Sequence, residues 1–216
     1  MKDIFKRLAH KILPQEQRSR RLIFGIAKGA RADIDFRYDS AFFFGRHEPM
    51  LFRHYRRLLR RGMTCFDIGS YRGWDALNLA HLTGTKTFSF DADPRFIDEA
   101  RRFVKPSGLP IEFVEVILGD GNNGTQTLDS IAAKFGHPDF VKMDIEGAES
   151  QVLRNSIVVL SKRPPLIVET HSKQIEDECI MILRDANYHI EIVDRSSSHF
   201  FSEARGDSHN RWLVAT

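Results

Sequence analysis

Carboxylate and glycine residues stand directly after several apolar runs of this sequence. Asp67, Gly69 and Gly73 follow one run, Asp91 ends the next, and Asp144 ends a later one. The turn from Asp67 to Gly73 lacks the full G-x-G-x-x-G pattern of dinucleotide sites, and its acidic surroundings would repel a pyrophosphate. Asp91, about 20 residues after the glycine turn, is placed to accept hydrogen bonds from ribose hydroxyls. The pattern predicts a site for a nucleoside with a cationic tail and no phosphates.

S-adenosylmethionine has that composition, and we expect it as the cofactor. Ligands of an open parallel sheet bind beyond the carboxyl ends of its strands, so the residues that follow each strand are the candidates. We expect cofactor contacts from Asp67, Gly69, Ser70, Tyr71, Gly73, Asp91, Ala92, Asp120 and Asp144. Asp91 has an alternative role as a helix cap, although Asp93 is better placed for that.

His171 is the main catalytic candidate, because it follows the fifth apolar run and histidine accepts protons near neutral pH. Asp144 is the next candidate, since an unpaired carboxylate at a buried strand end is unfavourable without a partner. Glu146 and Glu149 fall in the first turn of a helix, where negative charge is favoured in any case. Asp144, Glu146 and His171 could also ligate a divalent cation, but no helical metal spacing supports this. We therefore predict no metal site.

Alternating strands and helices must position these residues. Strand-like apolar runs cover 64–69, 87–91, 111–118, 140–145 and 165–170, and helical periodicity covers 74–83, 94–104, 127–135, 147–160 and 172–186. This alternation predicts an α/β fold with a parallel sheet covered on both faces. Two further strand-like runs, 188–193 and 211–215, have no helix between them. They should pair as an antiparallel hairpin at one edge and complete a seven-stranded sheet.

The amino-terminal part of the chain is strongly basic. Residues 1–61 hold 16 of the 32 Lys and Arg residues, whereas most of the 29 Asp and Glu residues follow. The sequence predicts an amphipathic helix that Pro14 ends, and a second basic helix over residues 18–28. A basic amphipathic helix can dock on the acidic remainder of the chain as a lid or lie on an anionic membrane. We favour the lid, and we place the boundary of this helical extension (1–47) before a second domain (48–216).

Composition excludes other classes of protein. With 42% hydrophobic and 28% charged residues, the 216-residue chain can bury a core and is not globally disordered. No apolar run approaches the roughly 18 residues that a membrane span requires, and charges interrupt the start too often for a signal peptide. Cys65 and Cys179 both lie in apolar segments. We expect no disulfide framework and a cytoplasmic location.

Several stretches carry a resemblance to a known family. Phe66–Gly73 resembles the first motif of class I S-adenosylmethionine-dependent methyltransferases. Val141–Glu149, which contains Lys-x-Asp-x-Glu-Gly-Ala-Glu, resembles the FkbM family of these enzymes. The segments 90–94, 127–131 and 167–171 are similar to the same family. The chain departs from the usual family pattern at Ser70–Arg72, where bulky side chains occupy the glycine turn, and over 119–127, which is shorter than its counterpart.

The resemblance implies a Rossmann-like class I methyltransferase domain and methyl transfer from S-adenosylmethionine to a hydroxyl oxygen. It suggests a carbohydrate or specialised metabolite as acceptor, and the basic amino-terminal part would suit an anionic one. Two alternatives remain open: an RNA methyltransferase that uses the basic region, and a binding module that holds the cofactor without catalysis. Peripheral membrane contact is also left open, and we expect nucleic acid not to be the partner.

Overall fold

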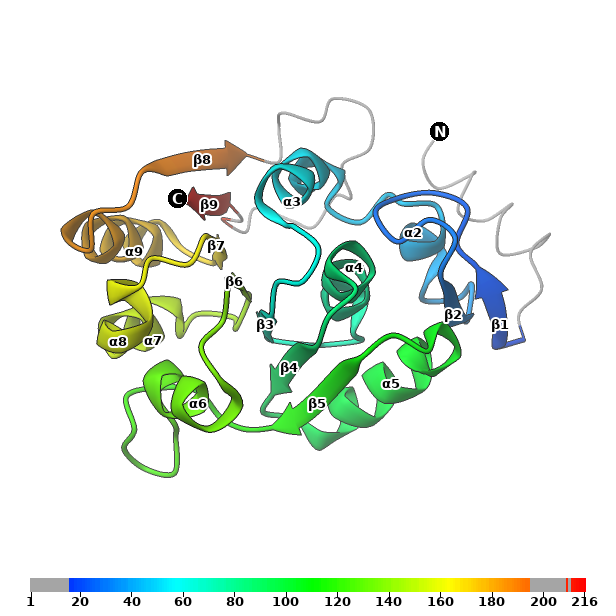
Figure 1. The fold of residues 1–216 in the computed structure, drawn as a ribbon, viewed down its shortest axis with the longest axis horizontal. Coiled ribbons are helices and arrows are strands. Elements are labelled where there is room, and N and C mark those ends of the chain that lie inside the picture. The colour runs from blue at the N-terminus through cyan, green and yellow to red at the C-terminus, as the bar shows by residue number, and fades with distance from the viewer. Residues whose placement is uncertain (1–15, 195–208, 210) are drawn as a thin grey trace.

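The computed structural model describes residues 16–194, 209 and 211–216. Seven strands form its central sheet in the order β5-β4-β3-β6-β7-β9-β8 (Figure 1). They are β3 (Cys65–Ile68), β4 (Thr87–Asp91), β5 (Ile111–Glu115), β6 (Phe140–Met143), β7 (Leu166–Thr170), β8 (Ile190–Asp194) and β9 (Arg211–Ala215). The strands β3 to β7 pair in parallel, whereas β9 is antiparallel to both β7 and β8. The predicted α/β sheet with an antiparallel edge hairpin is confirmed.

Helices cover both faces of the sheet. One face carries α3 (Phe52–Leu58), α4 (Trp74–Thr83) and α5 (Pro94–Val104), with the 3₁₀ turns η1 (Pro49–Leu51) before α3 and η2 (Lys105–Ser107) after α5 (Figure 1). The other face carries α6 (Leu128–Phe135), α7 (Glu149–Arg154), α8 (Ile157–Ser161) and α9 (Lys173–Asp185). Nearly all of these elements coincide with the predicted ranges.

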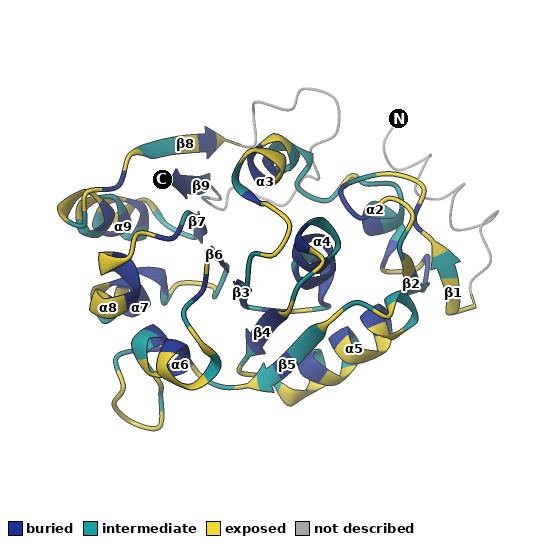
Figure 2. Cartoon of the chain, in the orientation of Figure 1, coloured by how far each residue is buried: buried dark blue, intermediate teal, exposed yellow. Residues whose placement is uncertain are grey.

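The helix α5 shows why the sequence folds in this way. Its buried residues Ile97, Ala100, Phe103 and Val104 recur at the helical period and face the sheet, while its charged residues face solvent (Figure 2). Pro94 occupies the first turn, where its missing N–H is not needed. The Asp93 side chain accepts a hydrogen bond from the Arg95 N–H, so Asp93 is the helix cap.

The central strands are buried on both faces, as covered parallel strands must be. All four positions of β6 are buried, and they include the charged residue Lys142. A buried ammonium requires anionic partners. The carboxyl end of β6 must therefore lie near carboxylates.

The prediction of a basic helix over residues 18–28 is wrong. The strands β1 (Arg18–Arg21) and β2 (Arg31–Ile34) form an antiparallel hairpin instead. Gly25 and Gly29 lie in the connection with φ of +82° and +96°, which a right-handed helix does not accommodate. Ala32 and Ile34 alternate inward and are fully buried. The predicted helix before Pro14 lies outside the described residues.

Residues 16–47, which we call the amino-terminal arm, pack against α4 and α5. Phe42 of α2 (Ser40–Phe43) stacks on Trp74 with ring centroids 5.1 Å apart. Arg72 lies 3.0 Å from Asp39 and 3.3 Å from Glu99, so one guanidinium joins the arm to the glycine turn and to α5. Phe42 thus belongs to the hydrophobic core, and Phe43 packs against it.

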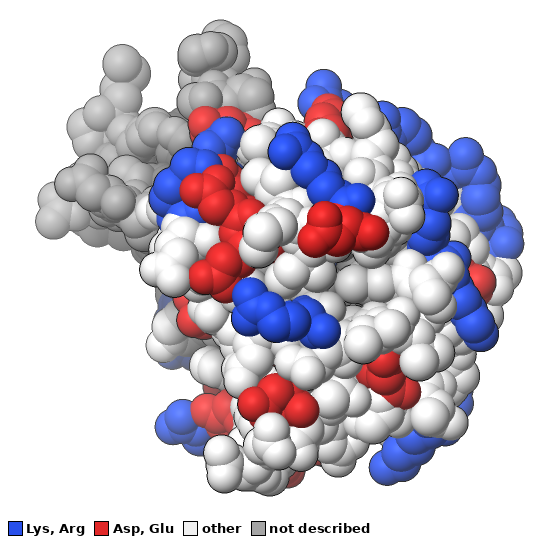
Figure 3. Space-filling model, turned by 90° about the vertical axis from the view of Figure 1, so that its left-hand side faces the viewer, with Lys and Arg blue, Asp and Glu red and all other residues white. Residues whose placement is uncertain are grey.

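Two surface properties bear on the open alternatives. Among the described residues, no helix has the length and apolar character that crossing a membrane requires. On the face where α8 and α9 lie, Lys and Arg side chains are interspersed with Asp and Glu (Figure 3). Neither positive nor negative charge therefore predominates on that face.

Candidate active site

A cavity of about 800 Å³ opens at the carboxyl ends of β3, β4 and β6. Its walls come from the amino-terminal arm, from the turns after these strands, and from α4 and α5. Its lining includes Arg37, His47, Glu48, Gly69, Ser70, Tyr71, Arg72, Asp75, Asp91, Ala92, Phe96, Asp144, Glu146 and Glu169. Six of the nine predicted cofactor residues, Asp144 among them, therefore line one cavity.

The glycine turn after β3 permits the close approach of two strand ends. Gly69 has a φ of +89°, and a Cβ atom built on it would lie 1.7 Å from the carbonyl oxygen of Asp144. The Asp144 N–H in turn donates to the carbonyl of Ile68 at 2.8 Å. Only glycine fits between the ends of β3 and β6, because any side chain there would displace the Asp144 backbone.

Asp91 ends β4 at the cavity wall, and the backbone fixes its carboxylate. Its Oδ2 accepts from the Tyr71 N–H and its Oδ1 from the Asp93 N–H, both at 2.9 Å. Each oxygen retains a lone pair for a ligand hydroxyl. Tyr71 itself has a φ of +40° and packs edge-on against Phe96, with ring centroids 4.9 Å apart. The bulky residues of the unusual turn thus form a wall beside Asp91.

Three predicted cofactor residues do not line this cavity. Asp67 is buried beneath it and accepts a 2.6 Å hydrogen bond from Ser89 Oγ, and burial raises the pKa of this carboxyl to about 8. A Cβ on Gly73 would meet Ala100, so this glycine serves helix packing. Asp120 accepts from the Asn122 N–H and organises its own turn.

His171 does not line the cavity itself, but it contacts two carboxylates that do, those of Asp144 and Glu146. Its Nε2 lies 3.3 Å from Asp144 Oδ1 and 3.5 Å from Glu146 Oε2. Its Nδ1 donates to Glu149 Oε1 at 2.9 Å, and Glu149 is fully buried. The same oxygen accepts the N–H groups of Ile145 and Gly147, so Glu149 holds both the loop and the imidazole.

A group of buried charges next to Asp144 was not predicted. Oxygen atoms of Glu48, Asp144 and Glu169 lie within 4.8 Å of one another. Lys142 Nζ lies 3.8 Å from Asp144 Oδ2 and 4.0 Å from Glu169 Oε2. Trp212 of β9 donates to Glu169 Oε2 at 3.1 Å. Lys142 is the only charged residue in the apolar run Phe140–Met143, and this could have indicated a group of buried charges. The sequence around Glu48 gives no sign that Glu48 belongs to the same group.

These neighbours set the protonation states of the site. Burial raises the pKa of Glu48 to about 7 and that of Glu169 to about 9. Burial would raise the pKa of Asp144 too, but the Lys142 ammonium, the His171 imidazolium and a hydrogen bond with Glu169 together outweigh it and hold this pKa below its ordinary value. Burial would lower the pKa of His171, but the Glu149 hydrogen bond and the surrounding carboxylates raise it to about 9. At neutral pH, Asp144 is ionised and His171 carries two protons.

The cavity suits the cofactor that the sequence predicts. Its glycine turn admits close approach of a ligand, Asp91 offers oxygen acceptors to ribose hydroxyls, and its many carboxylates favour a cation over a pyrophosphate. A sheet of this strand order with its ligand residues at the carboxyl ends defines the class I methyltransferases, which use S-adenosylmethionine.

Comparison with known proteins narrows this class to one family. The methyltransferase FkbM domain matches residues 83–195, slightly more than half of the chain. The chain therefore belongs to the FkbM methyltransferase family. The structure of an FkbM methyltransferase from Methylobacillus flagellatus superposes with a TM-score of 0.56 at 19% identity, over 73% of this chain and 45% of that one.

Two further similarities come from other methyltransferases. The structure of Aeropyrum pernix fibrillarin with bound S-adenosylmethionine superposes with a TM-score of 0.53 at 13% identity, over 73% of this chain and 67% of that one. In sequence, the chain is 30% identical over 91 residues to the protein-L-isoaspartate O-methyltransferase of Pyrococcus horikoshii. That match spans 41% of this chain and 40% of the relative.

Proposed function

We propose that this protein transfers a methyl group from S-adenosylmethionine to a hydroxyl oxygen of a neutral carbohydrate or specialised metabolite. The observation that carries the proposal is the single cavity that joins Asp91, on the β4 side, to Asp144 on the β6 side. Asp91 suits the ribose hydroxyls of the cofactor, and Asp144 suits the hydroxyl of an acceptor.

The cofactor, when bound, supplies a methyl group on a positively charged sulfur. The protein then has to align an acceptor oxygen with that methyl group, which can contribute a large part of the rate enhancement. Carboxylates around the cavity favour the charged cofactor in the ground state, so they act in binding more than in acceleration.

Asp144 and His171 have different roles in the removal of the acceptor proton. Asp144 lines the cavity and is ionised, so it can accept the hydrogen bond of an acceptor hydroxyl and take its proton. An attacking hydroxyl oxygen becomes strongly acidic as it gains the methyl group, so a weakly basic carboxylate suffices. His171 is already protonated at neutral pH, and it holds Asp144 in place from 3.3 Å away. The sequence favours His171 as the general base; we propose Asp144 for this role instead.

The acceptor side of the cavity favours a neutral acceptor. Glu48, Asp144, Glu146 and Glu169 line it, and two arginines in its wall, Arg37 and Arg72, are engaged by acidic residues of the protein. Among the described residues that line the cavity, an anionic acceptor would meet carboxylates without a free counter-charge, and like-charge contacts of this kind oppose binding. Neutral hydroxyl groups can donate to the same carboxylates.

Isotope transfer tests the proposal. The full-length protein is incubated with S-adenosylmethionine labelled in its methyl group and with a fractionated cell extract, and labelled products are located by mass spectrometry. We expect label on a hydroxyl oxygen, and at saturating cofactor its transfer should be reduced about 10²–10⁴-fold in Asp144→Asn. Label found on nitrogen, carbon or a carboxylate would contradict the proposal.

The sequence match to protein-L-isoaspartate O-methyltransferases provides a second candidate, methylation of a peptide carboxylate. A synthetic isoaspartyl peptide in the same assay separates the two candidates. The acidic cavity predicts that this peptide is not methylated. Transfer to the peptide at a rate above that for hydroxyl acceptors would favour the second candidate.

A further inference from the structure

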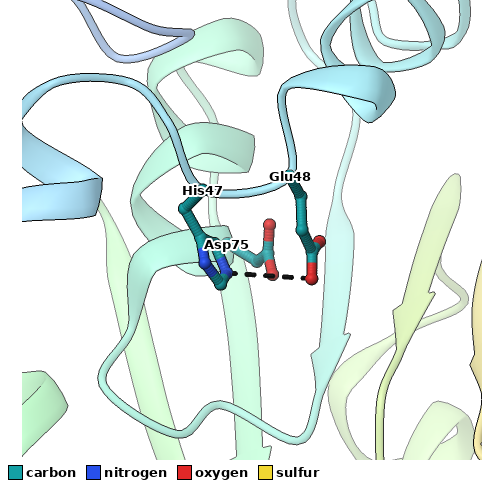
Figure 4. A group of neighbouring side chains, drawn as sticks. All are labelled: His47, Glu48 and Asp75. Carbon is teal, nitrogen blue, oxygen red and sulfur yellow. Dashed lines mark ion pairs between the residues drawn. The ribbon is translucent and has the colours of Figure 1, made fainter. Parts of the chain in front are cut away.

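Three potential metal ligands meet where the amino-terminal arm adjoins α4. His47 and Glu48 lie directly before η1, and Asp75 lies in the first turn of α4. Figure 4 shows their side chains converging from these two segments. One ligand atom from each lies within 4.8 Å of the other two, and His47 Nε2 is 3.8 Å from Glu48 Oε1. All three residues line the cavity.

We propose that His47, Glu48 and Asp75 form a binding site for a divalent transition-metal cation such as Mn²⁺ or Zn²⁺. One imidazole nitrogen and two carboxylates are donors that suit these cations, and three protein ligands leave positions open for water or an oxygen ligand. None of the three residues lies in the segment 83–195 that the FkbM domain matches.

An unsatisfied buried oxygen is the second observation that indicates a cation. The Glu48 side chain is only 10% exposed, and its Oε2 atom is buried without a hydrogen-bond partner in the part of the chain that the structure describes. A buried carboxylate oxygen without a donor is unfavourable. Glu48 also lies within 4.8 Å of Asp144 and Glu169, while Lys142 Nζ approaches those two carboxylates. A cation bound between His47, Glu48 and Asp75 would supply the partner that this buried Glu48 oxygen lacks.

Neighbouring residues orient two of the three ligands. The His47 ring packs edge-on against Phe42, with ring centroids 4.6 Å apart. Asp75 Oδ1 accepts a 2.9 Å hydrogen bond from the hydroxyl of Tyr55, which is buried. Partners behind the ligands that fix their orientation are typical of metal sites. The open positions of the bound cation would face the cavity, where an oxygen ligand could complete the coordination.

Direct binding of Mn²⁺ tests the site without requiring methyl transfer. The full-length protein, first treated with a chelator, is titrated with Mn²⁺ and followed by calorimetry and electron paramagnetic resonance. We expect one bound Mn²⁺ per chain, with nitrogen coupling from a histidine in pulsed spectra. Glu48→Gln and Asp75→Asn should each weaken the affinity at least about tenfold, and His47→Ala should also remove the nitrogen coupling.

A matched variant distinguishes this site from the group around His171. Glu146→Gln removes an exposed carboxylate of the Asp144–Glu146–His171 group, and we expect it to keep the full affinity for Mn²⁺. The proposal is overturned if no Mn²⁺ binds, or if binding is lost in Glu146→Gln and kept in Glu48→Gln.

S-adenosylmethionine binding, measured on each variant, reports the folded state and separates the two proposals. Retained cofactor affinity with lost Mn²⁺ affinity supports the metal site. If the cofactor fails to bind the native protein while Mn²⁺ binds through Glu48, the proposed methyl transfer is wrong and the metal site stands. Should Glu48→Gln and Asp75→Asn both unfold, His47→Ala, whose native side chain is 22% exposed, carries the test.

Discussion

On the β4 side of the cavity, the backbone holds the carboxylate of Asp91, which accepts hydrogen bonds from the N–H groups of Tyr71 and Asp93. On the β6–β7 side, Glu48, Asp144 and Glu169 converge around the buried Lys142, which has no hydrogen-bond partner there. The first side is therefore built locally from a turn, and the second from side chains brought together by the fold. A local turn tolerates changes in remote segments, whereas a cluster of buried charges depends on every member.

The largest effect should come from removing the cation of the cluster. Lys142→Met leaves buried carboxylates without their ammonium, and losing one partner of a buried ion pair costs about 3–5 kcal/mol of unfolding free energy. The loss should shrink as the pH falls and the carboxylates become protonated. Urea unfolding measures it, with the exposed Lys162→Met as control, expected within about 0.5 kcal/mol of the native protein. A Lys142→Met protein as stable as this control would contradict the cluster.

The next effect tests the turn on the opposite side. Gly69→Ala combines an unfavourable left-handed backbone, about 1–2 kcal/mol, with overpacking against Asp144, about 1–3 kcal/mol. We expect a loss of about 3 kcal/mol in unfolding free energy together with loss of cofactor binding. Gly108→Ala has a φ of +66° but open space around the new methyl group, so it should show the backbone term alone. Equal losses in both variants would show that the contact with Asp144 is unimportant.

A smaller effect concerns cofactor affinity. Asp91→Ala should weaken S-adenosylmethionine binding by about 1.5–3 kcal/mol, because a charged hydrogen-bond acceptor is lost at the cavity wall. Asp93→Ala should affect binding less, since that carboxylate contacts Arg95 and caps α5. Calorimetry on both variants gives the comparison. Equal affinities would remove Asp91 from the cofactor site.

The smallest effect should come from His54, a buried titratable residue that does not line the cavity and serves as a comparison for the buried charges that do. Burial lowers the pKa of His54, whose Nε2 accepts a hydrogen bond from Arg53. The unfolded chain therefore takes up a proton at His54 first as the pH falls below about 6.5, so the contribution of His54 to stability decreases with acidification from that point. Groups whose pKa is raised in the folded state, such as His171, contribute with the opposite sign. Thermal unfolding between about pH 7.5 and pH 5.5 measures the slope. His54→Gln should remove the contribution of His54, so its stability should fall less, or rise more, on acidification than that of the native protein. A slope equal to the native one would exclude a contribution from His54.

The two sides of the cavity also differ in how far the sequence predicted them. Asp91 and the glycine turn were predictable, because strand ends and turn glycines are local features. The capping role of Asp93 followed from its position directly before Pro94. Glu48 was not predictable, since its place beside Asp144 depends on how the arm crosses α4, far away in sequence.

The amino-terminal hairpin was missed for a different reason. The basic and apolar spacing over residues 18–28 resembles a helix, and that pattern was given more weight than Gly25 and Gly29. Both glycines lie in the left-handed region, where they redirect the chain between β1 and β2. Periodicity alone did not reveal the pairing with residues 31–34, because hairpin partners contribute nothing to a local period.

The position of β9 has a consequence for the order in which the protein can fold during synthesis. β9 lies between β7 and β8, although it follows both along the chain, and its Trp212 is the hydrogen-bond donor to Glu169. A nascent chain that has emerged only as far as β8 can pair β3 to β7, but it leaves one edge of β7 open and Glu169 without its indole. The ribosome must therefore release residues 211–215 before the β7 side of the cavity can close, whereas the β4 side can form earlier.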